Sequence, residues 1–504
     1  MKKVRVRFAP SPTGGLHIGG MRTVLFNYLF AKHNNGDFIV RIEDTDQNRF
    51  VQGAEEYIFE CLKWCGLQPD ESVVHGGDYA PYRQSERKEM YKQYAEQLIK
   101  DGNAYYAFDT PEELDAKRKS VPNFQYSISS RSKMKNSLTL NDDETQKLLN
   151  ENVPHVIRIK MPHDETIGFT DMIRGAINFN TSQVDDKVLL KADEMPTYHL
   201  AVVVDDYLMK ITHAFRGDEW LSSSPVHILL WQYLFGLENM PQWAHLPLIL
   251  KPDGKGKLSK RDGDRLGFPV FAMNWTDPKT GELTHGFRER GFLPEAFINM
   301  LALLGWNDGT EQEIFSLDEL IEKFSMERVH KGGAKFDYEK AKWFNHEWIK
   351  KLTVYSLQLT VKNILNDAGV ETNDESLLSK VIELVKDRCV LLTDFVQQSS
   401  FFFQLPKEID IAAVKPKWNE RKQQFFAELI RTYELSITWQ HNELENSFKE
   451  IAAASQIKPG DVLFPFRIML VGGKFGPGVF DVAVLIGKEE TIHRIKHTLQ
   501  LLGE

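Results

Sequence analysis

A glycine-rich segment near the amino terminus is the first stretch whose residue types could do chemistry. Residues 7–20 read RFAPSPTGGLHIGG, and a run with helical apolar spacing follows. Unpaired N–H groups at a helix N-terminus attract phosphate, and glycine lets the anion approach the backbone. His17 can donate a hydrogen bond to an oxygen whose charge grows during a reaction. The segment indicates a phosphate site, but an ordinary strand–turn–helix crossover stays open because a short glycine motif is weak evidence.

Charged residues also follow two later runs of apolar residues. Glu43 to Asp46 follow residues 38–42, and Arg216 follows residues 211–215. A guanidinium matches a carboxylate in shape and charge, so Arg7 and Arg216 in one pocket would suit an acidic substrate. Some carboxylates at 43–46 could instead cap the next helix, and this alternative stays open.

A basic loop spans residues 251–265, with KLSKR at residues 257–261. Because glycines flank it, we expect a mobile loop that could close over a polyphosphate and stabilise charge on its leaving group. Taken alone, the run is also typical of a solvated surface loop.

Strand and helix patterns place these groups together. Apolar residues alternate with arginines over residues 4–8, a helix is expected from residue 18, and residues 38–42 predict a second strand. The carboxyl ends of parallel strands meet at the edge where open α/β sheets bind ligands, so Glu43 should share a crevice with Arg7 and His17. Two more strands are expected at 198–204 and 211–215, and a helix from 222–225 through Leu234.

Composition narrows the class of protein. A chain of 504 residues predicts two to four domains, and a net charge of −9 excludes a uniformly basic nucleic-acid binder. No apolar run approaches the roughly 20 residues that span a membrane, and the first residues lack the apolar core of a signal peptide. Three cysteines are too few for a disulfide framework or a four-ligand zinc site. We therefore expect a cytoplasmic protein without a membrane partner.

The last third of the chain is expected to be helical, because apolar residues recur every three or four positions. Two basic segments with interleaved aromatic residues lie before it, at 117–135 and 331–351. Such segments suit an RNA backbone with exposed bases, although each could also be a solvated face.

Four motifs occur in a fixed order: PSPTGGLHIGG at 10–20, RIEDTD at 41–46, PTYHLA at 196–201 and KLSKR at 257–261. In this order they resemble the signatures of class I aminoacyl-tRNA synthetases, and more narrowly those of bacterial-type glutamyl-tRNA synthetases. Shorter matches at 81–87 (PYRQSER), 154–158 (PHVIR) and 291–296 (GFLPEA) extend the resemblance over essentially the whole chain.

The resemblance implies a multidomain fold, with a Rossmann-like α/β parallel-sheet catalytic domain, an α+β insertion and an all-helical anticodon-binding region. The implied boundaries are 1–105 for the first half of the catalytic domain, 106–195 for an inserted tRNA acceptor-binding domain, 196–330 for the second half with the basic loop and a stem-contact region, and 331–400 and 401–504 for two helical anticodon-binding subdomains. Glutaminyl-tRNA synthetases typically carry β-barrels in the last region, which favours glutamate.

The resemblance also implies roles for individual residues. Alignment and charge stabilisation would fall to His17, Lys257 and Lys260, with no protein nucleophile. The implied ATP-binding residues are His17, Gly19, Gly20, Glu219, Lys257, Leu258, Ser259, Lys260 and Arg261. The implied glutamate-binding residues are Arg7, Phe8, Ala9, Ser11, Glu43, Tyr198, Val202 and Arg216. Within the second set, Glu43 would take the α-amino group, and Arg216 with Arg7 the carboxylates.

The sequence departs from the family pattern at several positions. Gly20 stands where the superfamily has a histidine, Leu258 replaces a methionine, and Val202 replaces an asparagine that often touches the substrate in relatives. Residues 264–284 are longer than the usual linker. Some relatives bind a zinc ion near 105–125, but residues 104–108 read AYYAF, so no structural zinc is expected.

The activity that the resemblance implies is glutamate–tRNA ligation. L-Glutamate and ATP with Mg²⁺ would form glutamyl-adenylate, and the glutamate would pass to the 3′-terminal adenosine of tRNA(Glu). A monomer is expected. A glutaminyl-tRNA synthetase and an enzyme that also charges tRNA(Gln) with glutamate stay open as alternatives. A small-molecule nucleotidyltransferase would not explain the helical C-terminal region, and a non-catalytic RNA-binding protein would not need both ATP signatures.

Overall fold

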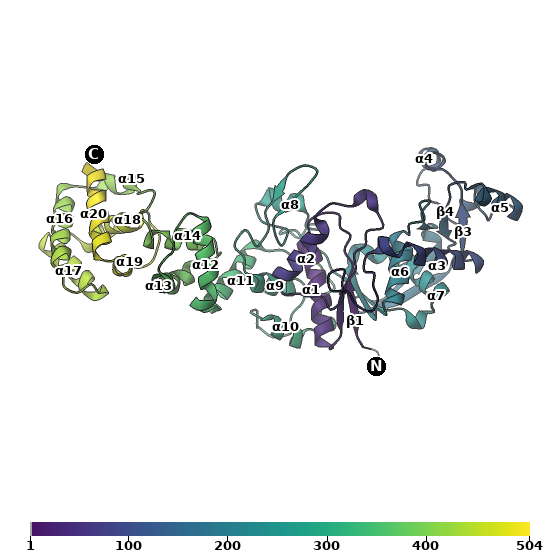
Figure 1. Ribbon diagram of the computed structural model, residues 1–504, viewed down its shortest axis with the longest axis horizontal. Coiled ribbons are helices and arrows are strands. Elements are labelled where there is room, and N and C mark those ends of the chain that lie inside the picture. Colours follow the sequence, from purple (N-terminus) through teal and green to yellow (C-terminus); the bar gives the residue numbers. More distant parts are fainter. Residues whose placement is uncertain (1–2, 504) are drawn as a thin grey trace. The chain divides into compact units, whose positions relative to one another are not determined.

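The computed structural model describes residues 3–503 and divides into two compact units. The first unit contains the residues up to 289 together with 297–338, and the second contains 290–296 with the residues from 339 onward. Figure 1 labels many of the elements of both units. The division separates an α/β unit from a helical one, so each is described by itself.

A four-stranded parallel sheet forms the centre of the first unit. Its order is β2 (Asp37–Val40), β1 (Arg5–Phe8), β8 (His213–Gly217) and β9 (Gln242–Leu246). Helix α1 (Ile18–His33) connects β1 to β2 and packs on β1, β2 and β8 (Figure 1). The predicted parallel βαβ unit is confirmed. All four residues of β1 are buried, so its arginines lie inside the protein as well as its apolar residues.

The predicted strand at 198–204 is wrong, because these residues form helix α6 (Tyr198–Leu208). Residues 200–206 of this helix are all buried, so its sequence shows no polar face. A continuous apolar run of this length cannot be assigned to helix or strand by periodicity alone. The next strand, β8, lies two residues later than predicted, and helix α7 (Ser224–Leu234) begins with the predicted Ser-Pro pair.

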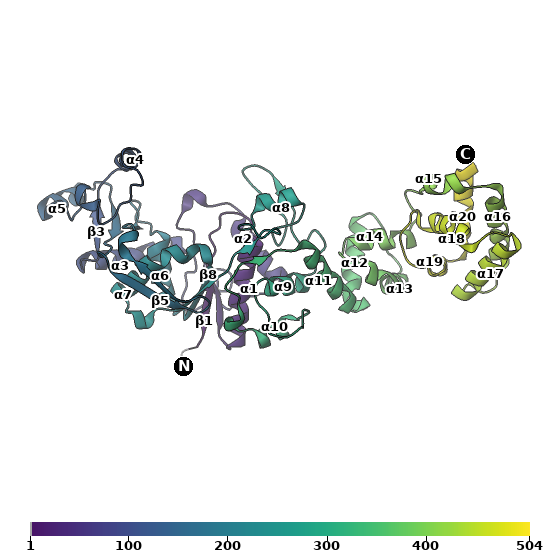
Figure 2. The ribbon, with the colours of Figure 1, turned by 180° about the vertical axis from the view of Figure 1, so that it is seen from behind.

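The segment between the halves of the sheet contains antiparallel strands. Strands β3 (Ala104–Ala107), β4 (Val156–Ile159) and β7 (Val188–Leu190) form one sheet, with α4 (Pro111–Ser120) and α5 (Asp142–Asn150) between β3 and β4. A hairpin of β5 (Thr166–Asp171) and β6 (Gly175–Asn180) adjoins it in sequence, and β5 contacts α7 (Figure 2). This insertion has the α+β character that the sequence predicted.

The other elements of the first unit surround the sheet. They are α2 (Ala54–Trp64), α3 (Lys88–Lys100), β10 (Ile249–Leu250), α8 (Lys260–Leu266), β11 (Trp275–Thr276), β12 (Leu283–Thr284), α9 (Pro294–Leu303), α10 (Leu317–Lys323) and β13 (Ala334–Lys335). Helix α9 begins in the stretch assigned to the second unit. The segment after α8, which is longer than expected, forms the β11–β12 hairpin.

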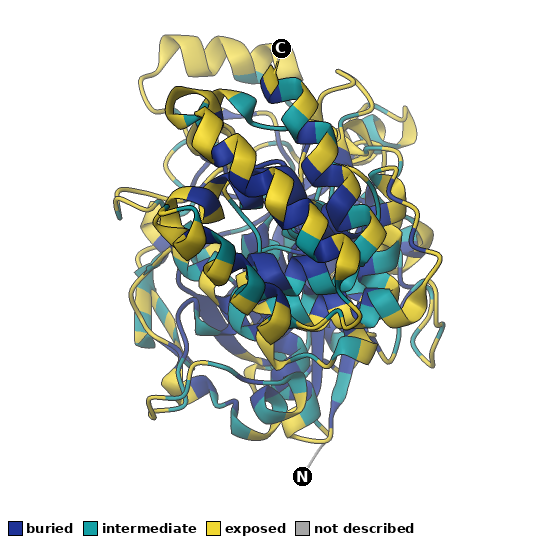
Figure 3. Ribbon diagram, turned by 90° about the vertical axis from the view of Figure 1, so that its left-hand side faces the viewer, coloured by how far each residue is buried: buried dark blue, intermediate teal, exposed yellow. Residues whose placement is uncertain are grey.

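The second unit consists of helices, as predicted. They are α11 (Tyr338–Lys351), α12 (Val354–Asp367), α13 (Glu375–Val385), α14 (Asp394–Ser399), α15 (Ile411–Val414), α16 (Glu420–Leu435), α17 (His441–Ala454), α18 (Pro459–Val471), α19 (Val479–Ile486) and α20 (Lys488–Gly503). Buried and exposed residues alternate along these helices (Figure 3), which reflects the three- and four-residue spacing of their apolar positions.

Across residues 3–503, no helix is long and apolar enough to cross a membrane. Cys61, Cys65 and Cys389 are all buried and unbridged.

Candidate functional site

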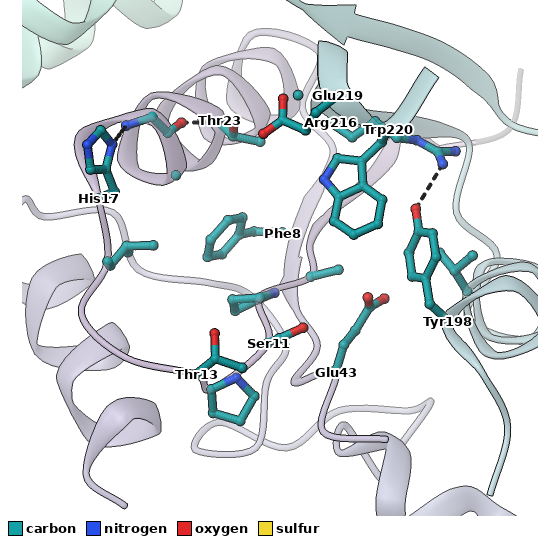
Figure 4. A pocket seen from close by; sticks show the side chains of 18 of the residues that line it. Phe8, Ser11, Thr13, His17, Thr23, Glu43, Tyr198, Arg216, Glu219 and Trp220 are labelled. Carbon is teal, nitrogen blue, oxygen red and sulfur yellow. Dashed lines mark hydrogen bonds between the residues drawn. The ribbon is translucent and has the colours of Figure 1, made fainter. Parts of the chain in front are cut away.

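A cavity of about 930 Å³ lies at the carboxyl ends of the parallel strands (Figure 4). Each strand contributes residues at or just beyond its carboxyl end: Ala9 to Thr13 after β1, Glu43 to Asp46 after β2, Gly217 at the end of β8 with Glu219 and Trp220 beyond it, and Pro247 to Ile249 after β9. The predicted common crevice of Arg7, Glu43, Arg216 and His17 is therefore present in the structure.

Two further regions complete the wall of the cavity. Helix α6 contributes Tyr198 and Val202, and the basic loop contributes Lys257, Leu258 and Ser259. All predicted glutamate-pocket residues line the cavity: Arg7, Phe8, Ala9, Ser11, Glu43, Tyr198, Val202 and Arg216. Of the predicted ATP set, His17, Gly19, Gly20, Glu219, Lys257, Leu258 and Ser259 line it, whereas Lys260 and Arg261 do not.

His17 is the N-cap residue of α1. Its Nδ1 atom accepts a hydrogen bond from the Gly19 amide at 3.2 Å. Burial and the nearby Lys257 cation lower the pKa of His17 to about 4, so the ring is neutral at pH 7 and carries its proton on Nε2. That buried Nε2 has no hydrogen-bond partner among residues 3–503. The Nε2 donor of His17, a residue that lines the cavity, is thus left without an acceptor within the described residues.

A buried ion network lies behind the part of the cavity that Glu43, Tyr198 and Arg216 line. The Arg7 Nε and Arg41 Nη1 atoms donate to Asp206 Oδ1 at 3.0 and 2.9 Å, and Arg41 Nη2 donates to Glu43 Oε1 at 3.0 Å. Arg87 Nε donates to Asp205 at 2.7 Å. Three guanidiniums therefore face three carboxylates, and their charges balance.

The network sets the ionisation of its carboxylates. Burial acts to raise the pKa of Asp206, but the Arg7 and Arg41 guanidiniums outweigh it, and the pKa lies below its usual value. Burial raises the pKa of Glu43, and Arg41 and Arg7 oppose that rise only in part. Asp206 is a permanent anion of the scaffold, whereas Glu43 reaches the cavity wall (Figure 4).

Arg216 differs from the other three arginines. It is 7% exposed, and its Nη1 atom donates to the Tyr198 hydroxyl and to His227 Nδ1, each at 3.1 Å. Its guanidinium lies 4.8 Å from the centre of the Trp243 ring. Within residues 3–503 it has no carboxylate in ion-pair range, and its buried Nε has no partner. The cavity wall therefore holds a cation without a counterion.

The basic loop beside the cavity makes exposed ion pairs. Lys257 Nζ lies 2.5 Å from Glu219 Oε1, and the two side chains are 54% and 44% exposed. Lys260 Nζ lies 3.4 Å from Glu282 Oε2, which belongs to the segment before β12. The loop that the sequence predicted as mobile through residue 265 ends at α8, because Ser259 caps a helix that begins at Lys260. Because Lys260 is the first residue of this helix, its side chain points toward the β11–β12 hairpin.

Sequence reasoning missed several residues around the cavity. Arg41 precedes the acidic motif and reads as an ordinary strand-end residue, so only the fold reveals its pairing. Trp220 lines the cavity, with its ring 4.6 Å from that of Tyr198. Lys191 reaches it from the insertion and donates to the Thr45 carbonyl at 3.0 Å. Among residues 3–503 no group of three or more His, Cys, Asp or Glu residues could hold a metal ion.

Comparison with known proteins adds independent findings. Residues 3–343 match the family model of the class I tRNA synthetases (E and Q), catalytic domain, and residues 339–499 match an anticodon binding domain. The chain is 50% identical over 502 residues to a glutamate–tRNA ligase of Phocaeicola vulgatus, covering 99% of both chains. It is 51% identical over 506 residues to one of Flavobacterium johnsoniae, covering 99% of this chain and 100% of the relative.

A solved structure agrees with these relatives. The crystal structure of a glutamate tRNA ligase from Elizabethkingia meningosepticum in complex with its amino acid matches with a TM-score of 0.94 at 49% identity. The match covers 99% of this chain and 100% of that one. The similarity thus includes both units and every strand end that lines the cavity.

Proposed function

Because this chain belongs to the glutamate–tRNA ligase family of class I tRNA synthetases, we propose that it activates L-glutamate with ATP and transfers it to the terminal adenosine of tRNA(Glu). The cavity at the sheet edge is the proposed site of activation.

The unpaired charge of Arg216 is the observation that carries this proposal. Arg7, Arg41 and Arg87 each contact a carboxylate of the protein, whereas Arg216 contacts only neutral groups. A buried cation that lacks a counterion favours a ligand with a carboxylate at that place, and a guanidinium can bind it with two parallel hydrogen bonds. This charge balance favours glutamate over glutamine.

The roles proposed for the amino-acid side follow from its charges. Glu43 would accept the α-amino group, and Arg216 with Arg7 would hold the carboxylates. The Arg7 Nε donates to Asp206 and its Nη1 donates to the Phe215 carbonyl at 3.4 Å, which leaves Nη2 of that guanidinium for the ligand. Phe8, Ala9, Ser11, Tyr198 and Val202 would shape the remainder of the pocket. Val202 is an apolar wall here, so the polar contact made by the asparagine of relatives would come from another group.

The proposed ATP side combines a helix N-terminus with the basic loop. His17, Gly19 and Gly20 would approach phosphate or ribose, and Glu219, Lys257, Leu258 and Ser259 would lie beside the nucleotide. Lys260 and Arg261 belong to the same proposed set, but they must turn toward the cavity to reach it. Mg²⁺ is bound largely through substrate phosphates and keeps several waters, so it would enter as a complex with ATP.

The proposed reaction has two steps. The α-carboxylate of glutamate attacks the α-phosphate of ATP, which forms glutamyl-adenylate and releases pyrophosphate. A hydroxyl of the terminal adenosine then attacks the adenylate carbonyl and releases AMP. His17, Lys257 and Lys260 would act by alignment and by stabilising charge on the phosphates.

The second unit supports an RNA substrate. Its residues from 339 match an anticodon-binding model, and lysines with interleaved aromatic rings lie at its start. We propose that the helices divide into subdomains at 331–400 and 401–504, and that 106–195 binds the acceptor end. We also propose a cytoplasmic monomer; the three unbridged cysteines agree with a reducing compartment.

Charging of purified tRNA(Glu) and tRNA(Gln) with labelled glutamate and with labelled glutamine tests the proposal. We expect glutamyl-tRNA(Glu) and no glutamine product. Glutamylation of tRNA(Gln) would identify an enzyme with two tRNA substrates. Charging with glutamine in place of glutamate, or no ATP-dependent charging at all, would overturn the proposal.

A further inference from the structure

Two histidines, His227 buried and His199 half-buried, continue the line of hydrogen bonds behind Arg216. His227 lies on α7 and is fully buried, with Nδ1 3.1 Å from Arg216 Nη1. Its Nε2 lies 3.2 Å from Nδ1 of His199 on α6. The three residues come from β8, α7 and α6, so three elements meet at this point.

The direction of these hydrogen bonds follows from the chemistry of the groups. A guanidinium only donates, so Nδ1 of His227 must accept. Burial and the Arg216 cation keep the pKa of His227 well below its usual value, and the ring is therefore neutral. Its single proton then lies on Nε2 and is donated to His199. Burial lowers the pKa of His199 to about 4, so that ring can accept.

A buried carboxylate on the neighbouring strand's side, Asp171, is engaged elsewhere. His245 lies opposite Arg216 in the register of β8 and β9, and its Nδ1 is 2.7 Å from Asp171 Oδ2. Asp171 also accepts the amides of Ile173 and Arg174, each at 2.9 Å. The negative charge of Asp171 is thus directed at His245 and the backbone, and it does not pair with Arg216.

Arg216 is consequently held in place by neutral groups alone. The Tyr198 hydroxyl and His227 accept from it, and the Trp243 ring lies beside it. A carboxylate at position 227 would fix the guanidinium equally well, but it would also cancel its charge. Because His227 is neutral, Arg216 keeps its positive charge for the ligand.

We propose that His227 is a specificity-determining positioning residue, which orients Arg216 as a neutral acceptor and so preserves the positive charge that selects an acidic side chain over its amide. This inference rests on the proposed function. His227 acts through Arg216 and does not line the cavity itself.

Three substitutions in the full-length chain test the inference. His227→Gln keeps a neutral acceptor and a donor. His227→Glu introduces a side chain of nearly the same shape as glutamine, but with a carboxylate. His227→Leu removes both hydrogen bonds. For each variant we would measure the kcat and KM for glutamate in tRNA(Glu) charging and the KM for ATP. We would also measure the rate of charging with glutamine and the inhibition constant of glutamine against glutamate.

We expect His227→Gln to stay within about threefold of the wild type, because an amide can make both bonds. We expect His227→Leu to raise the glutamate KM about tenfold with the ATP KM unchanged, since a buried donor loses its acceptor. We expect His227→Glu to lower the preference for glutamate over glutamine by about tenfold or more, because a buried counterion neutralises Arg216.

Equal behaviour of the Gln and Leu variants, or an undiminished preference for glutamate in a folded His227→Glu variant, would overturn the inference. Thermal unfolding followed by circular dichroism shows whether each variant is folded. If His227→Glu does not fold, the comparison of Gln with Leu decides. If the wild type charges no tRNA with glutamate, the proposed function fails; if the wild type is active and the variants behave alike, only the role of His227 fails.

Discussion

The two sides of the cavity use charge in opposite ways. On the proposed amino-acid side, the side chains of Arg41, Asp205 and Asp206 are at most 3% exposed, and their ion pairs link the residue that follows β2 to α6. On the proposed nucleotide side, the side chains in the Lys257–Glu219 and Lys260–Glu282 pairs are between 32% and 62% exposed.

This difference has energetic consequences. An exposed ion pair contributes about 0–1 kcal/mol, whereas removal of one partner from a buried pair costs about 3–5 kcal/mol. Buried ion pairs therefore hold the proposed amino-acid side in a fixed arrangement, which would let it distinguish ligands by their charge. On the proposed nucleotide side, the lysines would exchange their carboxylate partners for phosphate at little cost, which suits a loop that opens and closes.

The largest effect is expected from Asp206→Asn, which keeps the shape of the side chain and removes its charge. Arg7 and Arg41 then lose their shared carboxylate in a buried setting. We expect the free energy of unfolding to fall by about 3–5 kcal/mol in denaturant titrations. Glu86→Gln, at the exposed pair with Arg83, is the matched control and should change it by less than about 0.5 kcal/mol. Similar losses in both variants would show that burial does not distinguish these pairs.

Arg216→Ala should have the next largest effect, on binding rather than stability. Loss of a charge-assisted hydrogen-bonding group should raise the KM for glutamate about a hundredfold, or roughly 3 kcal/mol. Arg216→Lys keeps the charge without the planar fork and should lie between the wild type and the alanine variant. The KM for ATP is the internal control. An unchanged glutamate KM in Arg216→Ala would remove Arg216 from the pocket.

Lys260→Ala tests the nucleotide side. We expect adenylate formation, followed by pyrophosphate exchange in the presence of tRNA, to slow by roughly tenfold to a hundredfold, because a cation on the phosphates is lost. Glutamate binding should hardly change. Arg265→Ala removes another cation of α8, one whose side chain is 67% exposed, and should leave both quantities unaltered. Equal losses of adenylate formation and glutamate binding would contradict the separation of the two sides.

What the sequence could predict differs between the two sides as well. Arg7 and Arg216 are the next-to-last residues of their strands, and Glu43 lies shortly after β2. His17 caps the helix that follows β1, so a correct parallel topology is enough to bring the four together. The pairing of Arg41 with Asp206 joins residues 165 positions apart and depends on α6, whose apolar run at its centre resembles a strand. Such a long-range pair leaves no local pattern to read.

The placement of Lys260 was unpredictable for another reason. Its type and spacing agree with a phosphate-binding role, but its direction depends on where α8 begins. Ser259 caps that helix through Asp262, and Lys260 becomes its first residue. The long segment after α8 then supplies Glu282 as a partner. The start of α8 and the β11–β12 hairpin together determine where the Lys260 side chain points, and the motif alone does not predict either of them.

Acid sensitivity offers a smaller test, centred on His17. Its pKa is about 4 in the fold, below the unfolded value of roughly 6.5, so the unfolded chain binds more protons between these values. Stability should therefore fall as the pH drops from 6.5 toward 4. His17→Gln should reduce this slope by up to about 1 kcal/mol per pH unit in unfolding titrations. The exposed His163→Gln serves as the control, and a slope reduced equally by both would refute the assignment.

The smallest effect is expected from Glu282→Gln, which releases Lys260 from its partner. Because the Glu282 side chain is 62% exposed and the pair is 3.4 Å long, its loss should alter stability by less than about 0.5 kcal/mol. A freed Lys260 should lower the KM for ATP by less than about threefold, in initial-rate measurements at saturating glutamate. The glutamate KM should not move, since the ion network around Asp206 is untouched. A tenfold change in the ATP KM would mean that the ion pair of Lys260 holds its side chain as firmly as the buried ion pairs hold the arginines. The proposed contrast between a rigid amino-acid side and a movable nucleotide side would then be wrong.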